Sequence, residues 1–276
     1  MDNVFNVLGH YFRVMKKEID LAKLRHKCEK IAQNDEKSYI SANRQKIYTS
    51  DVEVFNDVSK NNIFEGFWET QTNWSLHKVN SHRWNNQMNF MKQEFIPLLK
   101  KTDCVFDVAC ATGEWSFLVS PYVKRVDGFE LSAHMVEYAS KESDRRGFSN
   151  TSFVQADITK YNIKGEYNNG MCLGMLTFIF NEKDAKRIVE GFYKLLKNGG
   201  FLVTKDTLNI DDRWSGTMFV YNYRDGYKAI FRDVNNYYKL YKDTGFELIK
   251  ETDLDEEDES TGLRRVSRCV IWKKPE

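Results

Sequence analysis

The sequence lacks any long apolar run, and no stretch approaches the roughly 20 consecutive apolar residues that a membrane-spanning helix needs. Its amino-terminal residues also lack the apolar core and the small-residue cleavage site of a signal peptide, because Arg13, Lys16 and Lys17 come early in the chain. We therefore expect neither a membrane span nor a secretory leader.

An excess of charge of either sign is missing as well. The 41 Lys and Arg residues nearly balance the 40 Asp and Glu residues, and the formal net charge is +1. No whole-molecule field then favours a nucleic-acid backbone, so nucleic acid is not the expected partner. The five cysteines form no CxxC pair, which argues against a disulfide framework or a metal site and fits a reducing, cytoplasmic location.

What the sequence does contain is typical of a globular protein, with 41% hydrophobic and 29% charged residues. Apolar residues recur at helical spacing between residues 4 and 32. This pattern predicts one or two amphipathic helices, packed on the main domain or forming a surface for homodimerisation or for docking a partner.

A polar connection over residues 33–62 leads from these helices into an aromatic cluster. Large aromatic side chains can fill a core or wall a pocket. The cluster comprises Phe64, Phe67, Trp68, Trp74 and Trp84. We predict a helical extension or cap over residues 1–84 and one catalytic domain over residues 85–276.

Helical and strand-like segments alternate after this cap, which predicts a mainly parallel sheet covered by helices on both faces. The predicted strands span 104–109, 125–130, 151–155, 169–174, 200–205, 245–251 and 265–273. The predicted helices span 88–99, 114–120, 132–146, 182–197 and 234–243. An acidic stretch, 253–259, joins the last two strands without a helix, and we expect it to be a solvated loop in an antiparallel hairpin. The expected fold is α/β, a seven-stranded, mainly parallel, doubly wound sheet with an antiparallel last strand.

The segment 105–115 places a strand, the carboxylate of Asp107, a run of small residues and a helix start in that order. Small residues let the backbone approach a ligand closely, and the first N–H groups of a helix suit a carboxylate. Asp107 would accept from a charged amine, a contact worth roughly 1.5–3 kcal/mol when desolvated. This arrangement fits the amino-acid tail of S-adenosylmethionine.

A second strand ends in Glu130, roughly 20 residues past the small-residue turn, where an acid can accept both hydroxyls of a ribose. A dinucleotide oxidoreductase shares this order, but it would normally show a G-x-G-x-x-G turn, which residues 107–113 do not supply. The two acids together indicate a nucleoside with an amino-acid tail.

With these residues the chain resembles the class I S-adenosylmethionine-dependent methyltransferases, whose first motif is a strand, an acidic residue and a glycine-rich turn. The resemblance covers about residues 85–276 and implies S-adenosylmethionine as cofactor and S-adenosylhomocysteine as product. It also implies that Asp157 bonds the adenine amine while Ile158 packs on the ring. The implied cofactor-binding residues are Asp107, Ala109, Thr112, Gly113, Glu130, Leu131, Met135, Asp157, Ile158, Leu173 and Gly174.

The chain departs from the family motif at Ala109 and Ala111, where many members have Gly. Alanine is tolerable at either site if its φ is negative, and on that expectation the pocket is slightly tighter. The departure keeps a non-catalytic methyltransferase-like partner protein open as an alternative.

Methyl transfer is an in-line displacement at an activated carbon, so the protein mainly aligns the acceptor and excludes water. A hydroxyl acceptor also needs a general base at the carboxyl edge of the sheet. We predict Asp206 as this base, with Arg232 and Tyr227 as acceptor ligands. Alternatively, Lys205 and Asp206 only cap a strand and the Tyr/Arg-rich insertion only covers the pocket.

The carboxyl-terminal layout looks like that of small-molecule and glycan-modifying methyltransferases, which is an analogy at the level of the fold. An Arg/Tyr pocket suits an anionic or hydroxyl-rich acceptor, so we expect O-methylation of a sugar, a sugar phosphate or a polysaccharide end. An RNA or small-amine N-methyltransferase is the alternative. Residues 177–180 read Thr-Phe-Ile-Phe, however, in place of the Asn/Asp-Pro-Pro-Tyr motif of base amino-group methylation.

Overall fold

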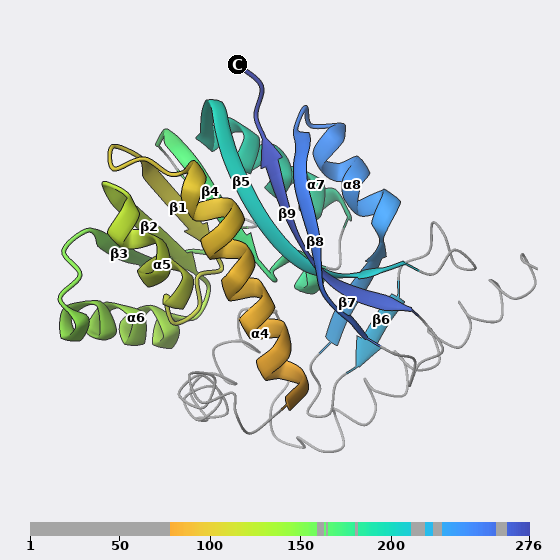
Figure 1. Cartoon of the computed structure of the whole chain (residues 1–276), viewed down its shortest axis with the longest axis horizontal. Helices are drawn as coiled ribbons and strands as arrows, with labels where there is room; N and C mark the ends of the chain where they lie inside the picture. The colour runs from red at the N-terminus through yellow and green to blue at the C-terminus, as the bar shows by residue number, and fades with distance from the viewer. Residues whose placement is uncertain are drawn as a thin grey trace, which may run out of the picture.

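A computed structural model describes residues 78–158, 163, 165–179, 182–210, 219–222, 228–257 and 264–276. Several sequence predictions lie outside these residues: the helices over 4–32, the connection over 33–62, four of the clustered aromatics and Tyr227. The described part forms a central sheet with helices on both faces (Figure 1).

The sheet contains the parallel strands that the alternation predicts, and they lie in the order β3, β2, β1, β4, β5. Strand β9 runs antiparallel to β5, and β8 runs antiparallel to β9. These seven strands confirm the predicted sheet and its antiparallel hairpin. The bounds are β1 Cys104–Val108, β2 Arg125–Glu130, β3 Thr151–Gln155, β4 Tyr167–Leu173, β5 Leu196–Asn209, β8 Glu247–Glu257 and β9 Arg265–Lys273.

Two further strands, β6 (Phe219–Asn222) and β7 (Lys228–Asp233), form an antiparallel hairpin that the sequence pattern does not predict. Strand β7 joins the sheet by pairing in parallel with the end of β5, where Leu208 lies opposite Arg232. Strand β5 itself runs well past the predicted end at residue 205 and pairs with β9 as far as Asn209. The sheet therefore projects beyond the carboxyl edge of β4 on this side.

The acidic stretch is not only a solvated loop, because β8 continues through it to Glu257. Its carboxylates are paired across the sheet and with α4: Asp253 accepts from Arg268, and Asp255 accepts from Arg83. Pairing with these guanidinium groups removes the repulsion that favours a loop in an acidic run. The prediction of a solvated loop is therefore wrong for residues 253–257.

The helices begin and end close to the predicted positions. Ser132 Oγ accepts the N–H of Met135 and starts α6, which ends at the left-handed Gly147, and Asp233 caps the start of α8. The helix predicted over 88–99 begins at least ten residues earlier and crosses the predicted boundary at 84/85. The bounds are α4 Lys78–Phe90, η2 Met91–Phe95, η3 Ile96–Leu98, α5 Glu114–Val119, η4 Ser120–Tyr122, α6 Ala133–Arg146, η5 Leu176–Phe178, α7 Glu182–Leu195 and α8 Val234–Lys242.

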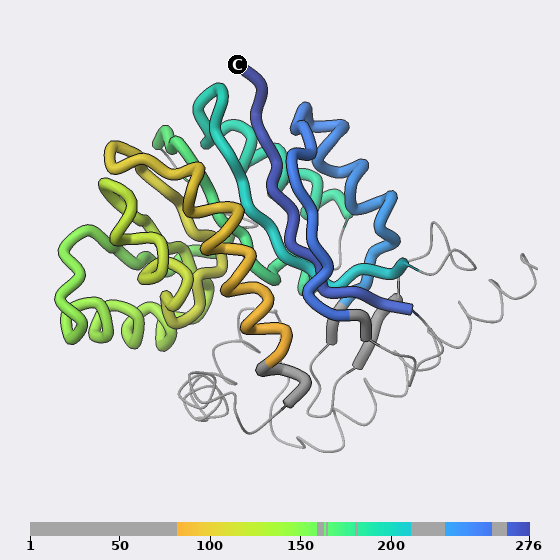
Figure 2. Tube along the Cα trace, viewed as in Figure 1, coloured from red at the N-terminus to blue at the C-terminus, as the bar shows by residue number. Residues whose placement is uncertain are grey.

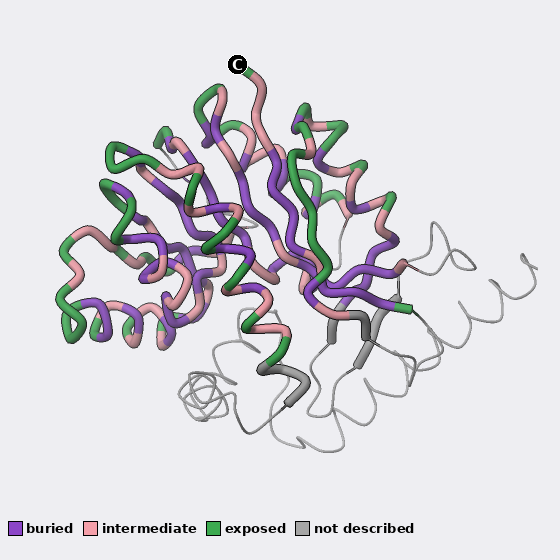
Figure 3. The backbone as a smooth tube through the Cα atoms, viewed as in Figure 1, coloured by how far each residue is buried: buried purple, intermediate pink, exposed green. Residues whose placement is uncertain are grey.

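Each face of the sheet carries its own apolar core, as a doubly wound fold requires. Helices α7 and α8 cover one face, where Phe192 and Tyr241 pack with strand residues such as Phe106. The residues of α4, η2 and α5 cover the other, where Met91 packs near Val203. Helix α4 lies against β8 and β9 (Figure 2). Figure 3 shows buried residues through the central strands and exposed residues along β8. Among the described helices, none is long and apolar enough to cross a lipid bilayer.

Candidate cofactor and acceptor site

The carboxyl ends of β3, β2, β1 and β4 meet at one edge of the sheet, because these strands are parallel neighbours. In open α/β sheets this edge is where ligands bind. All of the predicted cofactor residues lie at these strand ends or in the loops that follow them, and Met135 lies in the first turn of α6 just beyond β2. The structure thus brings together residues that are far apart in the sequence.

The loop after β1 has an alternating backbone, with positive φ at Ala109 (58°), Ala111 (49°) and Gly113 (84°). The expectation of negative φ at the two alanines is therefore wrong. Hydrogen bonds dictate this path, because the N–H groups of Ala109 and Cys110 both donate to the carbonyl of Phe129 at the end of β2. The N–H groups of Ala111 and Gly113 also donate within the protein, to Glu130 and to the Cys110 carbonyl, so the loop is held to β2 and to itself.

The left-handed alanines carry strain that glycine would not. We expect Ala111→Gly and Ala109→Gly each to raise the free energy of unfolding by about 0.5–1 kcal/mol, since relief of strain outweighs the larger entropy of the unfolded chain. Thermal and urea unfolding measure this change. Ala133→Gly, in the first turn of α6, is the matched control and is expected to destabilise the protein. Equal destabilisation by all three substitutions would show that Ala109 and Ala111 are not strained.

Glu130 ties the two loops of this edge together. Its Oε2 accepts the N–H of Ala111 at 3.0 Å, and its Oε1 accepts the N–H of Ser132 at 3.0 Å. Burial raises the pKa of this carboxyl, and the N–H donors of Ser132 and Ala111 oppose the rise. A carboxylate offers about four lone-pair sites, so each oxygen retains capacity for a ligand hydroxyl after these two bonds.

Asp107, on the neighbouring strand β1, is buried, and its Oδ2 accepts from Ser116 Oγ at 2.6 Å. Burial raises the pKa of this carboxyl to about 7, although the Ser116 hydroxyl opposes the rise; the charge of Glu130 adds to it. A cationic group next to Asp107 would favour its ionised form. The site is therefore suited to an amine and sensitive to pH near neutrality.

The remaining cofactor candidates lie at the same edge of the sheet as these two acids. Thr112, Gly113 and Met135 are buried, and five more are half-buried: Leu131, Asp157, Ile158, Leu173 and Gly174. Among the residues that the structure describes, no atom lies within 4 Å of a Cβ added to Gly174, whose φ is 102°. The end of β4 therefore borders open space beside the predicted cofactor residues.

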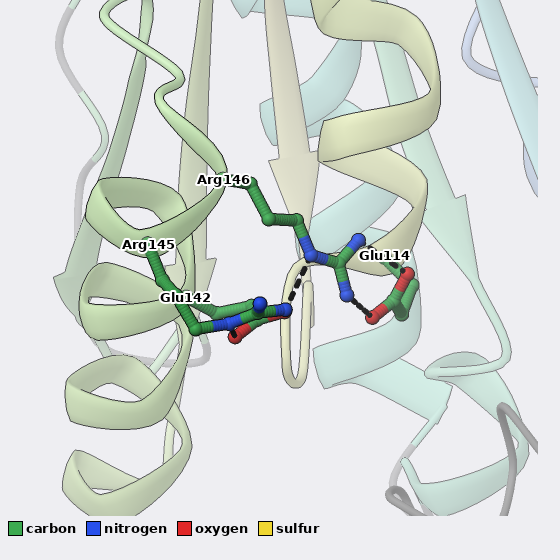
Figure 4. Close-up of polar contacts among 4 residues, drawn as sticks. All are labelled: Glu114, Glu142, Arg145 and Arg146. Atoms are coloured by element: carbon green, nitrogen blue, oxygen red, sulfur yellow. Dashed lines mark hydrogen bonds and ion pairs between the residues drawn. The ribbon is translucent and has the colours of Figure 1, made fainter.

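An ion-pair network fixes the start of α5 against the end of α6 (Figure 4). Arg146 donates to both carboxylate oxygens of Glu114, at 2.7 and 3.2 Å, and also to Glu142, which accepts from Arg145 as well. The Arg145 and Arg146 guanidinium groups lower the pKa of Glu142 to about 2. The Arg146 guanidinium also lies over the ring of Phe117 at 4.9 Å. These contacts hold the helix that follows the left-handed loop.

Asp206 is buried on β5 and faces α8. Its Oδ1 accepts from the N–H and the hydroxyl of Thr177, at 3.0 and 2.9 Å, and its Oδ2 accepts from the Tyr237 hydroxyl at 3.1 Å. Burial raises the pKa of Asp206. The carboxyl therefore joins β5 to η5 and α8, and its role as a base stays a prediction.

Arg232 has partners other than the expected acceptor. Its Nε donates to Glu182 at 2.8 Å, and its two Nη atoms donate to the carbonyls of Leu176 and Ile179, each at 2.5 Å. The side chain is 2% exposed. The Leu176 carbonyl also accepts the backbone N–H of Ile179, so the guanidinium adds a second donor there and supplies one to the Ile179 carbonyl. Arg232 thus holds the segment after β4 in the described structure.

Sequence reasoning missed several residues at this edge. Trp84 of α4 lies against Trp115 of α5, with ring centroids 4.5 Å apart, so one of the clustered aromatics does lie beside the loop after β1. Arg83 Nε lies 3.1 Å from both carboxylate oxygens of Asp255. Contacts between segments so distant in sequence leave no local signal. Within the described residues, no three His, Cys, Asp or Glu side chains gather as metal ligands would.

Comparison with known proteins agrees with this geometry. Residues 105–200 match the model of a methyltransferase domain family. The fold is similar to an S-adenosylmethionine-dependent methyltransferase from Clostridium acetobutylicum, with a TM-score of 0.57 and 15% identity over 78% of this chain and 99% of that one. It is also similar to a SAM-dependent methyltransferase from Methanosarcina mazei, with a TM-score of 0.53 and 17% identity over 64% of this chain and 95% of that one.

Residues 105–200 therefore resemble a methyltransferase domain, and the described residues have the Rossmann-like fold that S-adenosylmethionine-dependent methyltransferases have. This match and this fold agree with the methyltransferase that the motifs predict, while the roles of Asp107, Glu130 and Asp157 stay predictions. Among curated proteins, the 23S rRNA (uracil(1939)-C(5))-methyltransferase RlmD of a Marinomonas species is 38% identical over 60 residues. That match covers 22% of this chain and 14% of RlmD, so the chain spans only about a seventh of this relative's length.

Proposed function

We propose that this methyltransferase domain transfers a methyl group from S-adenosylmethionine to a small-molecule or glycan acceptor, with a hydroxyl oxygen as the methylated atom. The observation that carries the cofactor half of the proposal is Glu130, whose carboxylate spans the two loops at the carboxyl edge and retains lone pairs for a ligand. When bound, S-adenosylmethionine supplies a methyl group already activated on a sulfonium.

The residues fit this cofactor by charge and by space. Asp107 would hold the amine, because a buried carboxylate without a cation is unfavourable and an amine compensates it. Glu130 would accept the ribose hydroxyls, and Asp157 with Ile158 would bind the adenine. The open space beside Gly174 leaves room next to these groups for the reacting end of the molecule.

The acceptor side of the proposal involves the part of the sheet that projects past β4. We propose Asp206 as the general base, reached through the Thr177 hydroxyl that donates to it. Its raised pKa brings a carboxyl closer to the range in which a general base is effective near neutral pH. Arg232 would position η5 rather than contact the acceptor, because its donors already hold Leu176, Ile179 and Glu182.

Calorimetric titration of the full chain with S-adenosylhomocysteine tests the cofactor half. We expect saturable binding with one site per chain. Transfer of a labelled methyl group from S-adenosylmethionine is then screened against sugars, sugar phosphates, polysaccharide ends and small amines. If S-adenosylhomocysteine does not bind to the wild-type protein, the proposal of an enzyme is wrong and the protein is a non-catalytic relative of the family.

An RNA acceptor is the second candidate, because the curated matches include RlmD, an rRNA methyltransferase. The balanced charge of the chain does not favour it, and Thr177, at the position of the base-methylation motif, already bonds Asp206. RNA binding that weakens steeply with salt would support this candidate, whereas weak, salt-insensitive binding would exclude it. A cytoplasmic location and a homodimer through the amino-terminal helix stay predictions.

A further inference from the structure

Asp206 lies at the end of a chain of buried hydrogen bonds that runs from β9 across β5 to α8. The indole N–H of Trp272 donates to Thr204 Oγ1 at 3.0 Å. The Tyr237 hydroxyl lies 2.9 Å from Thr204 Oγ1 and 3.1 Å from Asp206 Oδ2. All four residues are at most 2% exposed, so solvent does not compete for these bonds.

The direction of this chain follows from the number of protons that each group carries. Trp272 can only donate, so Thr204 Oγ1 accepts from it. Tyr237 has one proton for two acceptors, of which the Asp206 carboxylate is the stronger because it is charged. The Thr204 hydroxyl then donates its own proton to the Tyr237 oxygen. Burial raises the pKa of Tyr237 well above its usual value, so the phenol keeps the proton that it donates to Asp206.

The packing of α8 leaves this donor little freedom. Tyr241 stacks on Trp272, with ring centroids 4.5 Å apart and an angle of 6° between the ring planes. The Tyr237 ring lies 5.1 Å from the Tyr241 ring, and all three rings belong to the core that α7 and α8 cover. Because a side chain in a close-packed core keeps one rotamer, the Tyr237 hydroxyl keeps its place beside Asp206.

The two oxygens of Asp206 thereby have different roles. Oδ1 accepts from the N–H and the hydroxyl of Thr177, and Oδ2 accepts from Tyr237. In the proposed reaction the proton of the acceptor hydroxyl passes to Thr177 Oγ1, while the Thr177 proton passes to Asp206 Oδ1. Tyr237 takes no part in that transfer, but its bond keeps Oδ2 engaged and Oδ1 turned toward Thr177.

We propose that Tyr237 is a positioning residue for the Asp206 base, because it orients the carboxyl group toward Thr177 and stabilises the charged form. The hydrogen-bond chain depends only on these side chains, whereas its service to a base rests on the proposed function. Tyr237→Phe leaves in place the other titratable or charged groups that lie around Asp206 on the neighbouring elements: Cys172, Lys205, Arg232, Tyr241, Arg268 and Cys269.

Titration of the full chain, labelled with carbon-13 at the aspartate carboxyl groups, tests this positioning without any acceptor. Asp206→Asn identifies the Asp206 signal by its absence. We expect Tyr237→Phe to raise the proton affinity of Asp206 roughly tenfold or more, because a hydrogen bond to the charged form is lost. Tyr238→Phe is the matched control, because the Tyr238 hydroxyl bonds Glu251 and Arg268 and its removal should leave the Asp206 titration unchanged.

An Asp206 titration that is the same in the wild type and in Tyr237→Phe, or that Tyr238→Phe shifts equally, would overturn the positioning role. If Tyr237→Phe does not fold, Thr204→Val replaces it, with Thr204→Ser as its control. Valine removes the hydroxyl that donates to Tyr237, so we expect a smaller rise in proton affinity, whereas serine should keep the wild-type value. Equal titrations in these two variants would likewise overturn the proposal.

The rate of methyl transfer is then measured against pH with an acceptor found in the screen. A base must lose its proton before it can act, so the acid limb of the profile should move to higher pH in Tyr237→Phe and stay in place in Tyr238→Phe. A shifted carboxyl titration with an unshifted rate profile would show that Asp206 is not the base and would overturn the proposal. If no acceptor is methylated, the proposed function fails, whereas a carboxyl titration that Tyr237→Phe shifts would still establish the hydrogen-bond chain.

Discussion

Glu130→Gln is expected to weaken S-adenosylhomocysteine binding about 100-fold or more. The amide has one acceptor oxygen where the carboxylate has two, so its NH2 group would face the N–H of either Ala111 or Ser132. The charge-assisted bonds to the ribose hydroxyls would be lost with it, and hydrogen bonds to a charged group are worth roughly 1.5–3 kcal/mol. Calorimetric titration measures the affinity.

The matched control is Glu137→Gln, which removes an exposed carboxylate on α6 that pairs with Lys141. We expect this variant to bind like wild type, because an exposed ion pair at helical spacing contributes little. Thermal unfolding separates a folding defect of Glu130→Gln from a loss of ligand contacts. Unchanged S-adenosylhomocysteine binding in a folded Glu130→Gln variant would remove Glu130 from the cofactor site.

Asp107→Asn is expected to change stability and ligand affinity in opposite directions. Burial raises the pKa of Asp107 from 3.8 to about 7, so the folded protein binds this proton more tightly than the unfolded chain does. Asp107 therefore lowers stability progressively as pH rises from about 4 to about 7, and the neutral amide removes that penalty. We expect Asp107→Asn to be more stable at pH 8 by on the order of 2 kcal/mol.

The same substitution removes the partner of the ligand amine, so S-adenosylhomocysteine affinity should fall about 10–100-fold at pH 8. In the wild type, affinity should decrease as pH drops below about 7, because Asp107 takes up a proton and its charge is lost. Asp107→Asn should lose this pH dependence. Urea unfolding and calorimetric titration at pH 6 and pH 8 measure both effects, and a destabilised variant with unchanged affinity would contradict the assignment.

The strand-and-turn order was readable from the sequence because each parallel strand is a short apolar run that ends in a distinctive residue. Asp107 and Glu130 stand at such ends, and the structure places them on neighbouring strands. The β6–β7 hairpin was not readable, since Lys228–Asp233 alternates weakly and its pairing with β5 depends on distant residues. The predicted end of β5 was too early because Asp206 interrupts the apolar run. Asp206 can be buried there because Thr177 and Tyr237, which are distant in the sequence, donate to its carboxylate.

Within the site, the type of a residue predicted its place at the sheet edge better than it predicted the groups that the residue contacts. Arg232 was expected at an acceptor from its chemistry, yet the carbonyls of η5 take the same donors. The left-handed backbone at Ala109 and Ala111 was contrary to expectation, because the bonds that impose it come from β2, and the residue type gives no indication of them.

The attachment of the β6–β7 hairpin has an evolutionary consequence. Strand β7 pairs with β5 at two register positions and holds η5 through Arg232, whereas the loops that carry Asp107 and Glu130 follow strands on the other side of β4. On the proposed function, relatives can exchange or lengthen this hairpin and acquire new acceptors while the cofactor loops keep their sequence. We then expect sequence variation among relatives to concentrate in residues 210–232 and sequence conservation to concentrate in residues 105–158.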